Sequence, residues 1–552
     1  MANAIETKLI NTIKDALTKA FPDLDVNSVN VMIEIPTVQK FGDYSSNIAM
    51  QLTRILRQNP RNLANLIIEN LDYAAGDIDR VEIAGAGFIN FFLKKGSLGS
   101  IIQNILSSDE NYGKGTYGNG KSYDVEFVSA NPTGDLHLGH ARQAALGDSI
   151  CRLLEAVGFD VEREYYINDA GNQIHNLALS LKARYNQIFN PDYKLPEDGY
   201  FGPDVINIAK GLAQEVNDKY VNKDDEETYT FFRTYGVKKE LEKLQKDLLD
   251  FRVNFTMWSS ETEIRKQGFV EKAVETLKEK GYLYENEGAV WFRTTDFGDD
   301  KDRVIVKTDG SYTYLTPDIA YHIQKLSRGY DFLVDLLGAD HHGYIARMKA
   351  AIQALGHEPN KLEIELVQMV RLIKDGQEMK MSKRTGNAVT IRELCEEVGT
   401  DAVRYYFVAR SASSHLDFDL DLASSTSSEN PDYYAQYAHA RTCQILELAK
   451  KNELVNDPSC AHLEHQKEID LMKFLATFPD VVLDAALTFT PSKITNYTQK
   501  LAQLFHAFYN ECKVIDLANV QLSQERLALV NATRITMRNA LNLVGVNAPN
   551  KM

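Results

Sequence analysis

The chain has 552 residues, of which 44% are apolar and 25% are charged. This length and composition are typical of a globular protein with roughly two to four domains. No run of about 18 uncharged apolar residues occurs, and charged residues alternate with apolar ones at helical spacing from the start of the chain. We therefore predict no membrane span, no secretory leader and a cytoplasmic location.

The net charge of −16 argues at first against a nucleic-acid partner, because contacts to phosphate need Lys and Arg. The acidity is confined to the first 430 residues, since residues 431–552 contain 12 Lys/Arg and 12 Asp/Glu. From residue 491 onward the counts are 7 and 3. This local excess fits either a solvated helix face or a surface that contacts RNA.

The cysteines are far apart in the sequence and include no Cys-x-x-Cys pair. This spacing argues against both a zinc site and a disulfide framework. We predict that the protein itself holds no metal and that its thiols are reduced, namely Cys151, Cys395, Cys443, Cys460 and Cys512.

Residues 1–115 are predicted to form a small α+β domain. Its expected elements, in order, are an amphipathic helix at 5–21, a strand at 29–35, a helical stretch at 46–71, a strand at 81–92 and a glycine-rich connector at 113–121.

A predicted strand at 122–128, a turn and a predicted helix at 141–157 come next. This order is the opening unit of a nucleotide-binding α/β sheet, in which the turn at the carboxyl end of the strand binds the ligand. Further strands are expected at 330–337 and 362–369. The charged helical patterns between them and the first unit, at about 181–280, predict an insertion that lies over the sheet.

From about residue 430 the pattern is almost wholly helical, with breaks expected at 456–458, 490–491 and 516–523. We therefore predict an α/β protein with three parts: an N-terminal α+β domain at 1–115, a Rossmann-type parallel-sheet catalytic domain at 121–425, and an all-α helical bundle at 426–552.

The predicted turn reads Asn-Pro-Thr-Gly-Asp-Leu-His-Leu-Gly-His, from Asn131 to His140. A helix N-terminus offers unpaired N–H groups and partial positive charge, which suit phosphate oxygens. Gly139 lets a nucleotide lie close to the backbone, and His137 and His140 can donate hydrogen bonds to charge developing at phosphorus. A bare His-x-Gly-His is more often a capped helix with two satisfied histidines, but the preceding Asn-Pro-Thr-Gly favours a phosphate site.

About 240 residues later, the sequence reads Lys-Met-Ser-Lys-Arg, with glycines before and after it. Three cations on one loop can clamp a triphosphate and neutralise the departing pyrophosphate. Alone, such a cluster is usually a basic surface loop. Together with the histidine turn, it indicates a site that splits ATP between its first two phosphates. The segment consists of Lys380, Met381, Ser382, Lys383 and Arg384.

The two segments resemble the "HIGH" and "KMSKS" signatures of class I aminoacyl-tRNA synthetases, and the finer wording resembles the arginyl-tRNA synthetase family. The blocks that carry this resemblance extend from residue 125 to residue 441. They include VEFVSANPTGDLHLGHAR at 125–142, YINDAGNQI at 166–174, YLTPDIAYH at 314–322, LGADHHGYI at 337–345, KMSKRTGN at 380–387, DAVRYYF at 401–407, DFDLDLA at 417–423 and NPDYYAQYAHAR at 430–441.

The resemblance implies two overlapping substrate sites and a set of catalytic groups. Carboxylates and planar acceptors suit a guanidinium, and the family positions for arginine correspond to Glu126, Asn131, His137, Tyr314, Asp318 and His341. Those for ATP correspond to His137, Gly139, His140, Gly338, Asp340, Met381, Ser382 and Lys383. The catalytic groups would be His137, His140, Lys380 and Lys383. Tyr166, Asn168 and Asp169 are expected at the mouth of the pocket.

The resemblance also implies the reaction and its partners. The carboxylate of L-arginine attacks the α-phosphorus of ATP, and the arginyl group of the adenylate then passes to the 3′ end of the tRNA. Magnesium is expected to enter with ATP, since no carboxylate cage is visible in the sequence. A monomer, and a requirement for tRNA before arginine is activated, are expected from the habit of the family.

The helical bundle resembles the anticodon-binding domain of the family. It interleaves aromatic and basic side chains that suit stacking on unpaired bases, although helical core packing explains at least half of those aromatics. The candidates for contact with tRNA are Tyr434, Tyr437, Arg441, Arg534 and Arg538. The N-terminal domain resembles the module thought to hold the tRNA elbow.

Three alternatives are open on the sequence. Another class I synthetase, such as the cysteinyl enzyme, is expected to show a cysteine-rich metal pocket. A small nucleotidylyltransferase shares the His-x-Gly-His turn but does not explain a helical tail of this length. A catalytically inactive paralogue that binds tRNA is disfavoured by the intact His137, His140, Lys380 and Lys383.

Overall fold

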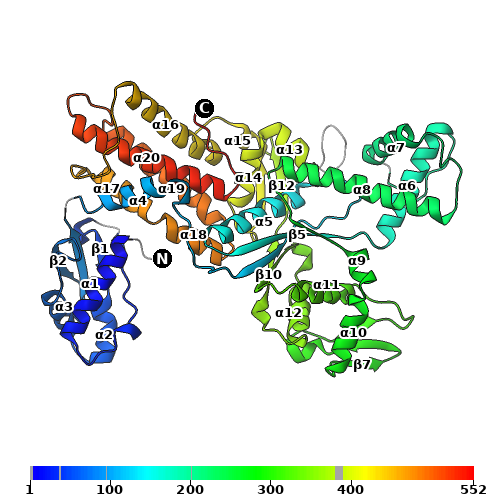
Figure 1. Cartoon of the computed structure of the whole chain (residues 1–552), viewed down its shortest axis with the longest axis horizontal. Helices are drawn as coiled ribbons and strands as arrows, with labels where there is room; N and C mark the ends of the chain where they lie inside the picture. The colour runs from blue at the N-terminus through cyan, green and yellow to red at the C-terminus, as the bar shows by residue number, and fades with distance from the viewer. Residues whose placement is uncertain (1–3, 37–38, 95, 201, 380–388) are drawn as a thin grey trace.

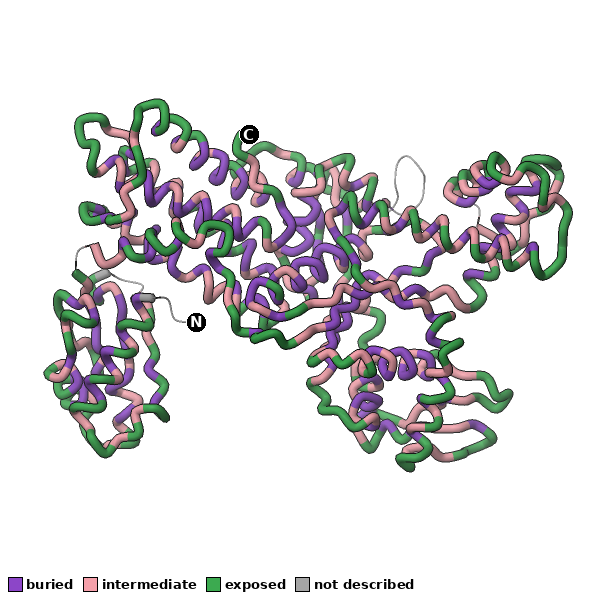
Figure 2. The backbone as a smooth tube through the Cα atoms, viewed as in Figure 1, coloured by how far each residue is buried: buried purple, intermediate pink, exposed green. Residues whose placement is uncertain are grey.

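The computed structural model describes residues 4–36, 39–94, 96–200, 202–379 and 389–552. Figure 1 shows an elongated molecule in which a helical bundle, a central sheet and a helical arm follow one another along the long axis, with the small N-terminal domain below the end of the bundle. Buried residues gather in the bundle and around the central sheet, as Figure 2 shows.

The N-terminal domain packs three helices on an antiparallel sheet with the strand order β1-β3-β2. The strands are β1 (Tyr44–Ser46), β2 (Ile78–Ala84) and β3 (Phe88–Leu93), and the helices are α1 (Ala4–Ala20), α2 (Ile48–Leu56) and α3 (Pro60–Glu69). The domain contacts the bundle through an ion pair of 2.8 Å between Asp43 and Lys473.

Two strand predictions in this domain were wrong in detail. Residues 29–35 form no strand and make a single bridge between Glu34 and Ser45, because Val29 and Val31 are buried without a partner strand. The run at 81–92 is two strands of a hairpin. It turns at Gly85 and Gly87, whose positive φ angles of 53° and 136° suit glycine.

A parallel sheet of five strands, in the order β11-β10-β4-β5-β6, forms the centre of the molecule, and the predicted Rossmann-type fold is confirmed. Its strands are β4 (Ser122–Glu126), β5 (Asp160–Ile167), β6 (Met257–Ser260), β10 (Phe332–Gly338) and β11 (Leu362–Val367). The chain leaves β4 toward β5 on one side and returns to β10 on the other. The carboxyl end of β4 is therefore the switch point at which such sheets bind ligands.

Helices connect these strands. The main ones are α5 (Leu138–Ala156), which follows the histidine turn, α11 (Leu315–Ser327) and α12 (Tyr344–Ala354). Helices α9 (Glu261–Lys266) and α10 (Phe269–Glu279) and an antiparallel sheet of β7 (Leu283–Asn286), β8 (Ala289–Phe292) and β9 (Arg303–Val306) lie between β6 and α11.

The predicted insertion at about 181–280 differs from the observed arrangement. The arm begins earlier, and Figure 1 shows it projecting away from the bundle, not over the sheet. It consists of α6 (Asn172–Phe189), α7 (Pro203–Val216) and α8 (Glu226–Asp250), which share a small core of their own. The chain then rejoins the central sheet as β6, a strand too short to be separated from the helical pattern around it.

A third small sheet and three helices lead from the central domain to the bundle. They are β12 (Val370–Lys374), β13 (Gln377–Glu378), β14 (Leu416–Asp419), α13 (Ile391–Val398), α14 (Thr400–Val408) and α15 (Leu420–Ser424). At the junction, the fully buried guanidinium of Arg404 contacts Asp148 of α5 and donates to the backbone oxygens of Phe251 and Val544.

The C-terminal bundle is all-α, as predicted, and α4 (Gly99–Ser108) packs against it. It comprises α16 (Pro431–Lys451), α17 (Gln466–Ala476), α18 (Phe478–Leu487), α19 (Ser492–Glu511) and α20 (Val520–Leu543). The breaks predicted at 456–458 and 490–491 lie between these helices, whereas the break predicted at 516–523 overlaps the first turn of α20, which begins at Val520.

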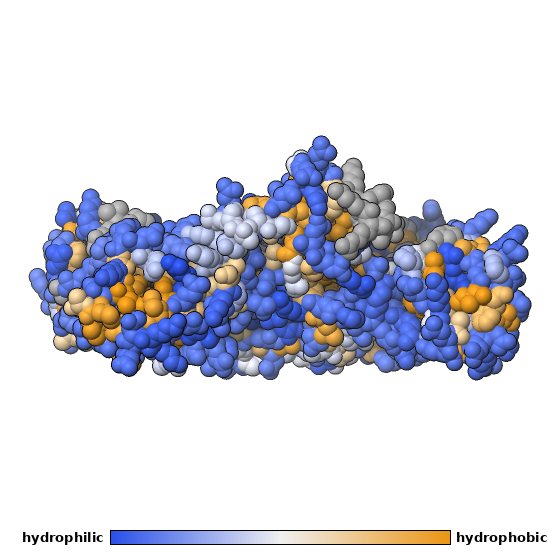
Figure 3. All heavy atoms as spheres, turned by 90° about the horizontal axis from the view of Figure 1, so that it is seen from above, coloured by the Kyte–Doolittle hydropathy of each residue, from blue (hydrophilic) through white to orange (hydrophobic). Residues whose placement is uncertain are grey.

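The outer surface is mainly polar. In the view of Figure 3, hydrophobic side chains form separate patches within a largely hydrophilic face. Over the described residues, no helix combines the length and the apolar character needed to cross a membrane.

Candidate active site

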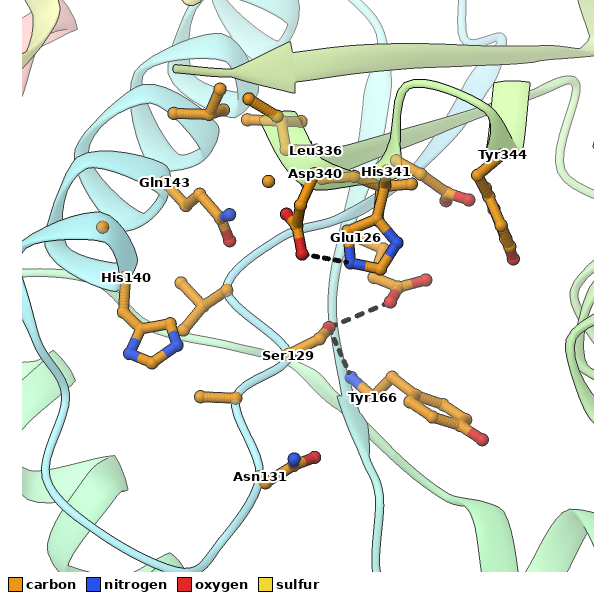
Figure 4. Close-up of a pocket in the computed structure, with 18 of the residues that line it drawn as sticks. Glu126, Ser129, Asn131, His140, Gln143, Tyr166, Leu336, Asp340, His341 and Tyr344 are labelled. Atoms are coloured by element: carbon orange, nitrogen blue, oxygen red, sulfur yellow. Dashed lines mark hydrogen bonds and ion pairs between the residues drawn. The ribbon is translucent and has the colours of Figure 1, made fainter. Parts of the chain in front are cut away.

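A cavity of about 1130 Å³ lies at the carboxyl ends of β4 and β10, where the strand order predicts a ligand site. Figure 4 shows His140 and Gln143 from α5 on one side, Asp340, His341 and Tyr344 on another, and Glu126 at the end of β4 between them. The predicted residues Asn131, His137, Gly139, Tyr314, Asp318 and Gly338 also line this cavity.

The two signature histidines are fixed by the start of α5. His137 is the N-cap, and its Nδ1 accepts a hydrogen bond of 3.1 Å from the backbone N–H of Gly139. In turn, the Nδ1 of His140 accepts from the backbone N–H of His137 at 3.3 Å, and the two rings stack with centroids 3.7 Å apart. The structure shows the capped helix, and the phosphate site predicted at the same turn stays a prediction.

This cap also fixes how the rings are protonated. Burial lowers the pKa of His137, and burial together with the neighbouring His137 ring lowers the pKa of His140 to about 3. Each neutral ring accepts at Nδ1, so its proton must be on Nε2. Both histidines are thus neutral Nε2–H donors near pH 7.

Gly139 and Gly338 both border the cavity at positions where an added Cβ would require a neighbouring side chain to shift. A Cβ on Gly139 would lie 3.1 Å from Cε1 of His137, and a Cβ on Gly338 would lie 2.6 Å from an Asp340 oxygen. Asp340 and His341 follow in a short 3-10 helix, with 3.6 Å between His341 Nε2 and the Asp340 carboxylate. The Asp340 side chain is 83% exposed and is free to meet a ligand from the cavity.

Glu126 has partners for both oxygens of its carboxylate. Oε1 accepts from the Ser129 hydroxyl at 2.9 Å, and Oε2 accepts from Lys325 Nζ at 2.5 Å. Ser129 also accepts from the backbone N–H of Tyr166 at 3.1 Å, which joins β4 to β5 across the cavity floor, as Figure 4 shows. Glu126 is held rigidly at the base of the pocket.

Lys325 is a buried cation beneath the cavity, with no exposed surface. Its ammonium group donates to Glu126 and, at 2.7 Å, to Asp335, which also pairs with His322 at 2.9 Å. Burial tends to lower the pKa of the Lys325 ammonium, but the surrounding carboxylates outweigh burial and raise it well above its usual value. The floor of the pocket is therefore a compensated network of buried charges.

Asp318, on the first turn of α11, lies in the cavity wall, and no Lys or Arg among the described residues forms an ion pair with it. Burial raises the pKa of its carboxyl to about 7; His322 opposes this shift and Glu126 adds to it. The nearby Tyr344 hydroxyl is its hydrogen-bond partner. A bound guanidinium would favour the ionised form and restore a lower pKa.

The rim of the cavity is more open. Tyr314 precedes α11 and is 92% exposed, while the Asn131 amide donates to Gln173 at 2.7 Å. Tyr166 and Asn168 line the cavity as expected. Asp169 does not, because its carboxylate accepts from Ser260 and from the backbone N–H of Thr262 at the end of β6.

The sequence reasoning missed Lys325, His322, Asp335 and Tyr344. His322 and Tyr344 lie within the blocks YLTPDIAYH and LGADHHGYI but were given no role there, and Lys325 and Asp335 lie outside both blocks. The partners of these residues come from separate strands and helices. The one available signal was on α11, where His322 and Lys325 lie in an otherwise apolar helical stretch after Asp318. The predicted residues Lys380, Met381, Ser382, Lys383 and Arg384 lie outside the described residues.

The tyrosines predicted to bind tRNA gather between α16 and α19. Tyr434 and Tyr437 lie 5.2 and 6.0 Å from the ring of His506, measured between centroids. Arg441 donates to the Tyr509 hydroxyl at 3.2 Å and covers its ring. We call the group of Tyr434, Tyr437, Arg441, His506 and Tyr509 the aromatic strip.

Arg534 and Arg538 lie elsewhere. Arg538 on α20 pairs with Asp109 at 2.7 Å, beyond the end of α4, and Arg534 donates to Asn531 at 3.0 Å. Burial lowers the pKa of His439 on α16 to about 4, and the charges of Arg534 and Arg538 add to this shift. Both arginines thus have protein partners on α20 and near the end of α4, and their predicted contact with tRNA stays a prediction.

Family models match the chain in three successive parts. The "Arginyl tRNA synthetase N terminal domain" matches residues 7–93, the "tRNA synthetases class I (R), catalytic domain" matches 101–407 and the "DALR anticodon binding domain" matches 435–552. The chain is also 54% identical to the arginine–tRNA ligase of Bacillus subtilis over the full length of both proteins. The chain belongs to the arginyl-tRNA synthetase family. It is an enzyme that ligates arginine to tRNA with ATP.

Other relatives agree with this assignment. The synthetase is 54% identical to the arginine–tRNA ligase of Geobacillus kaustophilus, with 99% of each chain covered. The solved arginyl-tRNA synthetase of Thermus thermophilus shares its fold, with a TM-score of 0.75, 20% identity, and coverage of 99% of this chain and 100% of that one. The alternatives of a nucleotidylyltransferase, another class I synthetase or an inactive paralogue receive no support.

Across the part of the chain that the structure describes, no group of three or more His, Cys, Asp or Glu side chains could hold a metal ion. The absence of a protein-bound metal remains a prediction. All five cysteines are free thiols, and four of them are buried.

Proposed function

We propose that the cavity at the ends of β4 and β10 carries out both steps of arginine–tRNA ligation. The observation that supports this best is that one cavity brings the two Nε2–H donors of the signature histidines together with the carboxylates of Glu126 and Asp318. Donors suit a phosphate, and buried carboxylates suit a guanidinium.

In this proposal the two ends of arginine bind on different sides of the cavity, because one end is positively charged and the other negatively charged. Asp318 receives the guanidinium, with Tyr314 covering it from the rim, and Asn131 and Glu126 orient the rest of the substrate. The α-carboxylate then faces α5, where His137 and His140 donate to the oxygens of the α-phosphate. These donors are fixed before ATP binds, so little reorganisation is needed as negative charge develops. Lys380 and Lys383 are proposed to neutralise the departing pyrophosphate.

Magnesium is proposed to enter with ATP. Among the described residues that line the cavity, Asp340 is the exposed carboxylate. This donor set fits an ion held mainly by the triphosphate oxygens, which Mg²⁺ accepts in preference to a cage of protein ligands. The ion supplies neutralisation of the triphosphate charge.

The aromatic strip is proposed to stack on unpaired bases of the tRNA anticodon loop. Tyr437 is 37% exposed beside His506, and Arg441 adds a positive charge over Tyr509, a combination that suits single-stranded RNA. Arg534 and Arg538 remain weaker candidates, because both have protein partners. We propose that the N-terminal domain holds the tRNA elbow.

We further propose that the synthetase works as a monomer in the cytoplasm. The monomer is expected from the habit of the family, and the five free thiols suit a reducing compartment.

The function is tested by charging purified tRNA with each of the twenty amino acids in turn. We expect arginine alone to be attached, with release of AMP and pyrophosphate. Attachment of a different amino acid would contradict the proposal. If the enzyme catalysed arginine-dependent pyrophosphate exchange but formed no charged tRNA, the function of the cavity would be limited to adenylate formation.

The raised pKa of Asp318 predicts that arginine binds more weakly in acid. The guanidinium binds the ionised carboxylate, so below a pKa of about 7 a proton must be released on binding. We expect KM for arginine to rise by up to about tenfold per pH unit below 7 and to level off above it. His322, whose pKa is raised mainly by Asp335 against burial, also faces this site.

An Asp318→Asn variant separates the two groups in this measurement. If the pH dependence of KM belongs to Asp318, it disappears in the variant. If it persists, His322 or another group is responsible.

A further inference from the structure

Helix α8 belongs to two parts of the molecule at once. Phe232, near its start, is fully buried in the small core of the arm. Leu244 and Leu248, near its end, are buried in the main core that includes α5 and β4. Figure 1 shows the helix running from the arm toward the centre of the molecule. A continuous helix of 25 residues is a stiff connection between the two parts.

On the central part of α8, Lys243 contacts the turn that carries the first ATP signature. Its ammonium group lies 2.9 Å from the carboxylate of Asp135, two residues before His137. It also lies 3.1 Å from Glu240 of the same helix and 3.8 Å from Asp204 of α7. Burial raises the pKa of Glu240 to about 7, and Lys243 opposes that shift. Lys243 is thus the cation that allows three carboxylates to meet at this point.

One helical turn further on, Asp247 contacts the helix that follows the second signature in the sequence. Its carboxylate accepts two hydrogen bonds from the guanidinium of Arg392 on α13, at 2.6 and 3.1 Å. Asp247 is 5% exposed. Residues spaced i and i+4 lie on one face of a helix, so a single face of α8 contacts both segments.

The two segments also touch each other directly. The backbone N–H of Ile391, just before Arg392, donates to the Leu136 oxygen at 2.9 Å, and Thr390 forms a β-bridge with His137. A shift of either segment relative to the other would therefore move the backbone around His137.

We propose that Lys243 and Asp247 are positioning residues for adenylate formation, which fix the turn of His137 and the start of α13 to one face of α8. Neither residue lines the cavity, so both act through other groups. This inference rests on the proposed function of the cavity, because it assigns the two contacts to the ATP side of that site.

Removal of Lys243 and removal of the Asp247 carboxylate are expected to have different physical effects. Without Lys243, Asp135 faces Glu240 and Asp204 with no intervening cation, and like-charge repulsion pushes the turn outward. Without the Asp247 carboxylate, α13 loses two charge-assisted hydrogen bonds. In both cases the donors of His137 and His140 move relative to the α-phosphate, while Asp318 and Lys325 keep their contacts.

The test is arginine-dependent pyrophosphate exchange with saturating tRNA, measured for Lys243→Met and Asp247→Asn. We expect kcat/KM for ATP to fall about tenfold to hundredfold, because small misplacements of reacting groups have effects of this size. KM for arginine should change less than about twofold. Lys243→Arg should recover most of the activity.

Lys246→Met is the matched control. Lys246 is on the same helix, 71% exposed and paired with Asp250, and we expect its variant to behave as wild type. A double-variant cycle of Asp247→Asn with Arg392→Gln adds a second check. If the two residues act as one contact, the double variant loses no more than either single variant.

The possible outcomes are distinct. Unchanged kcat/KM for ATP in both variants overturns the proposal. A rise in KM for arginine as large as the loss in kcat/KM for ATP, together with a lower melting temperature, also overturns it, since this would indicate a general structural role. Absence of exchange in the wild-type enzyme would refute the proposed function of the cavity instead.

Discussion

Replacement of Asp318 by asparagine is expected to lower kcat/KM for arginine by roughly 30-fold to several thousandfold, or about 2 to 5 kcal/mol. Asp318 lies in the cavity wall and has no ion-paired Lys or Arg within the described ranges, so the guanidinium is expected to supply its counter-charge. Asparagine keeps the shape and one acceptor but removes the charge. KM for ATP should change little, because the signature histidines are on α5.

The measurement is pyrophosphate exchange with varied arginine. Glu285→Gln is the matched control, since Glu285 is an exposed carboxylate on β7 away from the cavity lining. An Asp318→Asn enzyme with wild-type KM for arginine would show that the guanidinium binds elsewhere.

The second large effect is expected from His140→Ala, which should lower kcat for adenylate formation about 100- to 1000-fold. The variant removes a fixed Nε2–H donor to the α-phosphate. It also removes an acceptor for the His137 backbone N–H, a loss that should destabilise the fold by about 1 kcal/mol.

His140→Asn separates these two roles, because an asparagine side chain can still accept at the cap but does not reach the phosphate. We expect melting temperature to recover in this variant and kcat to stay low. If kcat recovers with melting temperature, the role of His140 is structural. The pKa of about 3 also predicts that no ionisation of His140 appears in the rate profile between pH 6 and 8.

Features that the sequence predicts well are those whose partners are close along the chain. The histidine turn is one, because strand, turn and helix are consecutive and the cap joins His137 to Gly139 and His140. The breaks of the bundle are another, since each coincides with Pro or polar residues between apolar helical stretches.

Features that depend on distant partners could not be predicted. Lys325 meets Glu126 across 199 positions of sequence, and a lysine on a helix is normally read as exposed. The alternation at 29–35 has the period of a strand, but it serves to bury Val29 and Val31 in the hydrophobic core without forming a strand. Arg538 is a further example, because its ion-pair partner Asp109 is distant in the sequence and becomes adjacent only in the folded chain.

The central claim is that buried carboxylates select arginine through the positive charge of its guanidinium. The most direct test compares arginine with citrulline, which has the same shape without the charge, as substrates for pyrophosphate exchange in the presence of tRNA. We predict that kcat/KM for citrulline is lower by at least about 1000-fold, because the ionised carboxylate of Asp318 would be left without a counter-charge. Citrulline used within about tenfold of arginine would contradict the account.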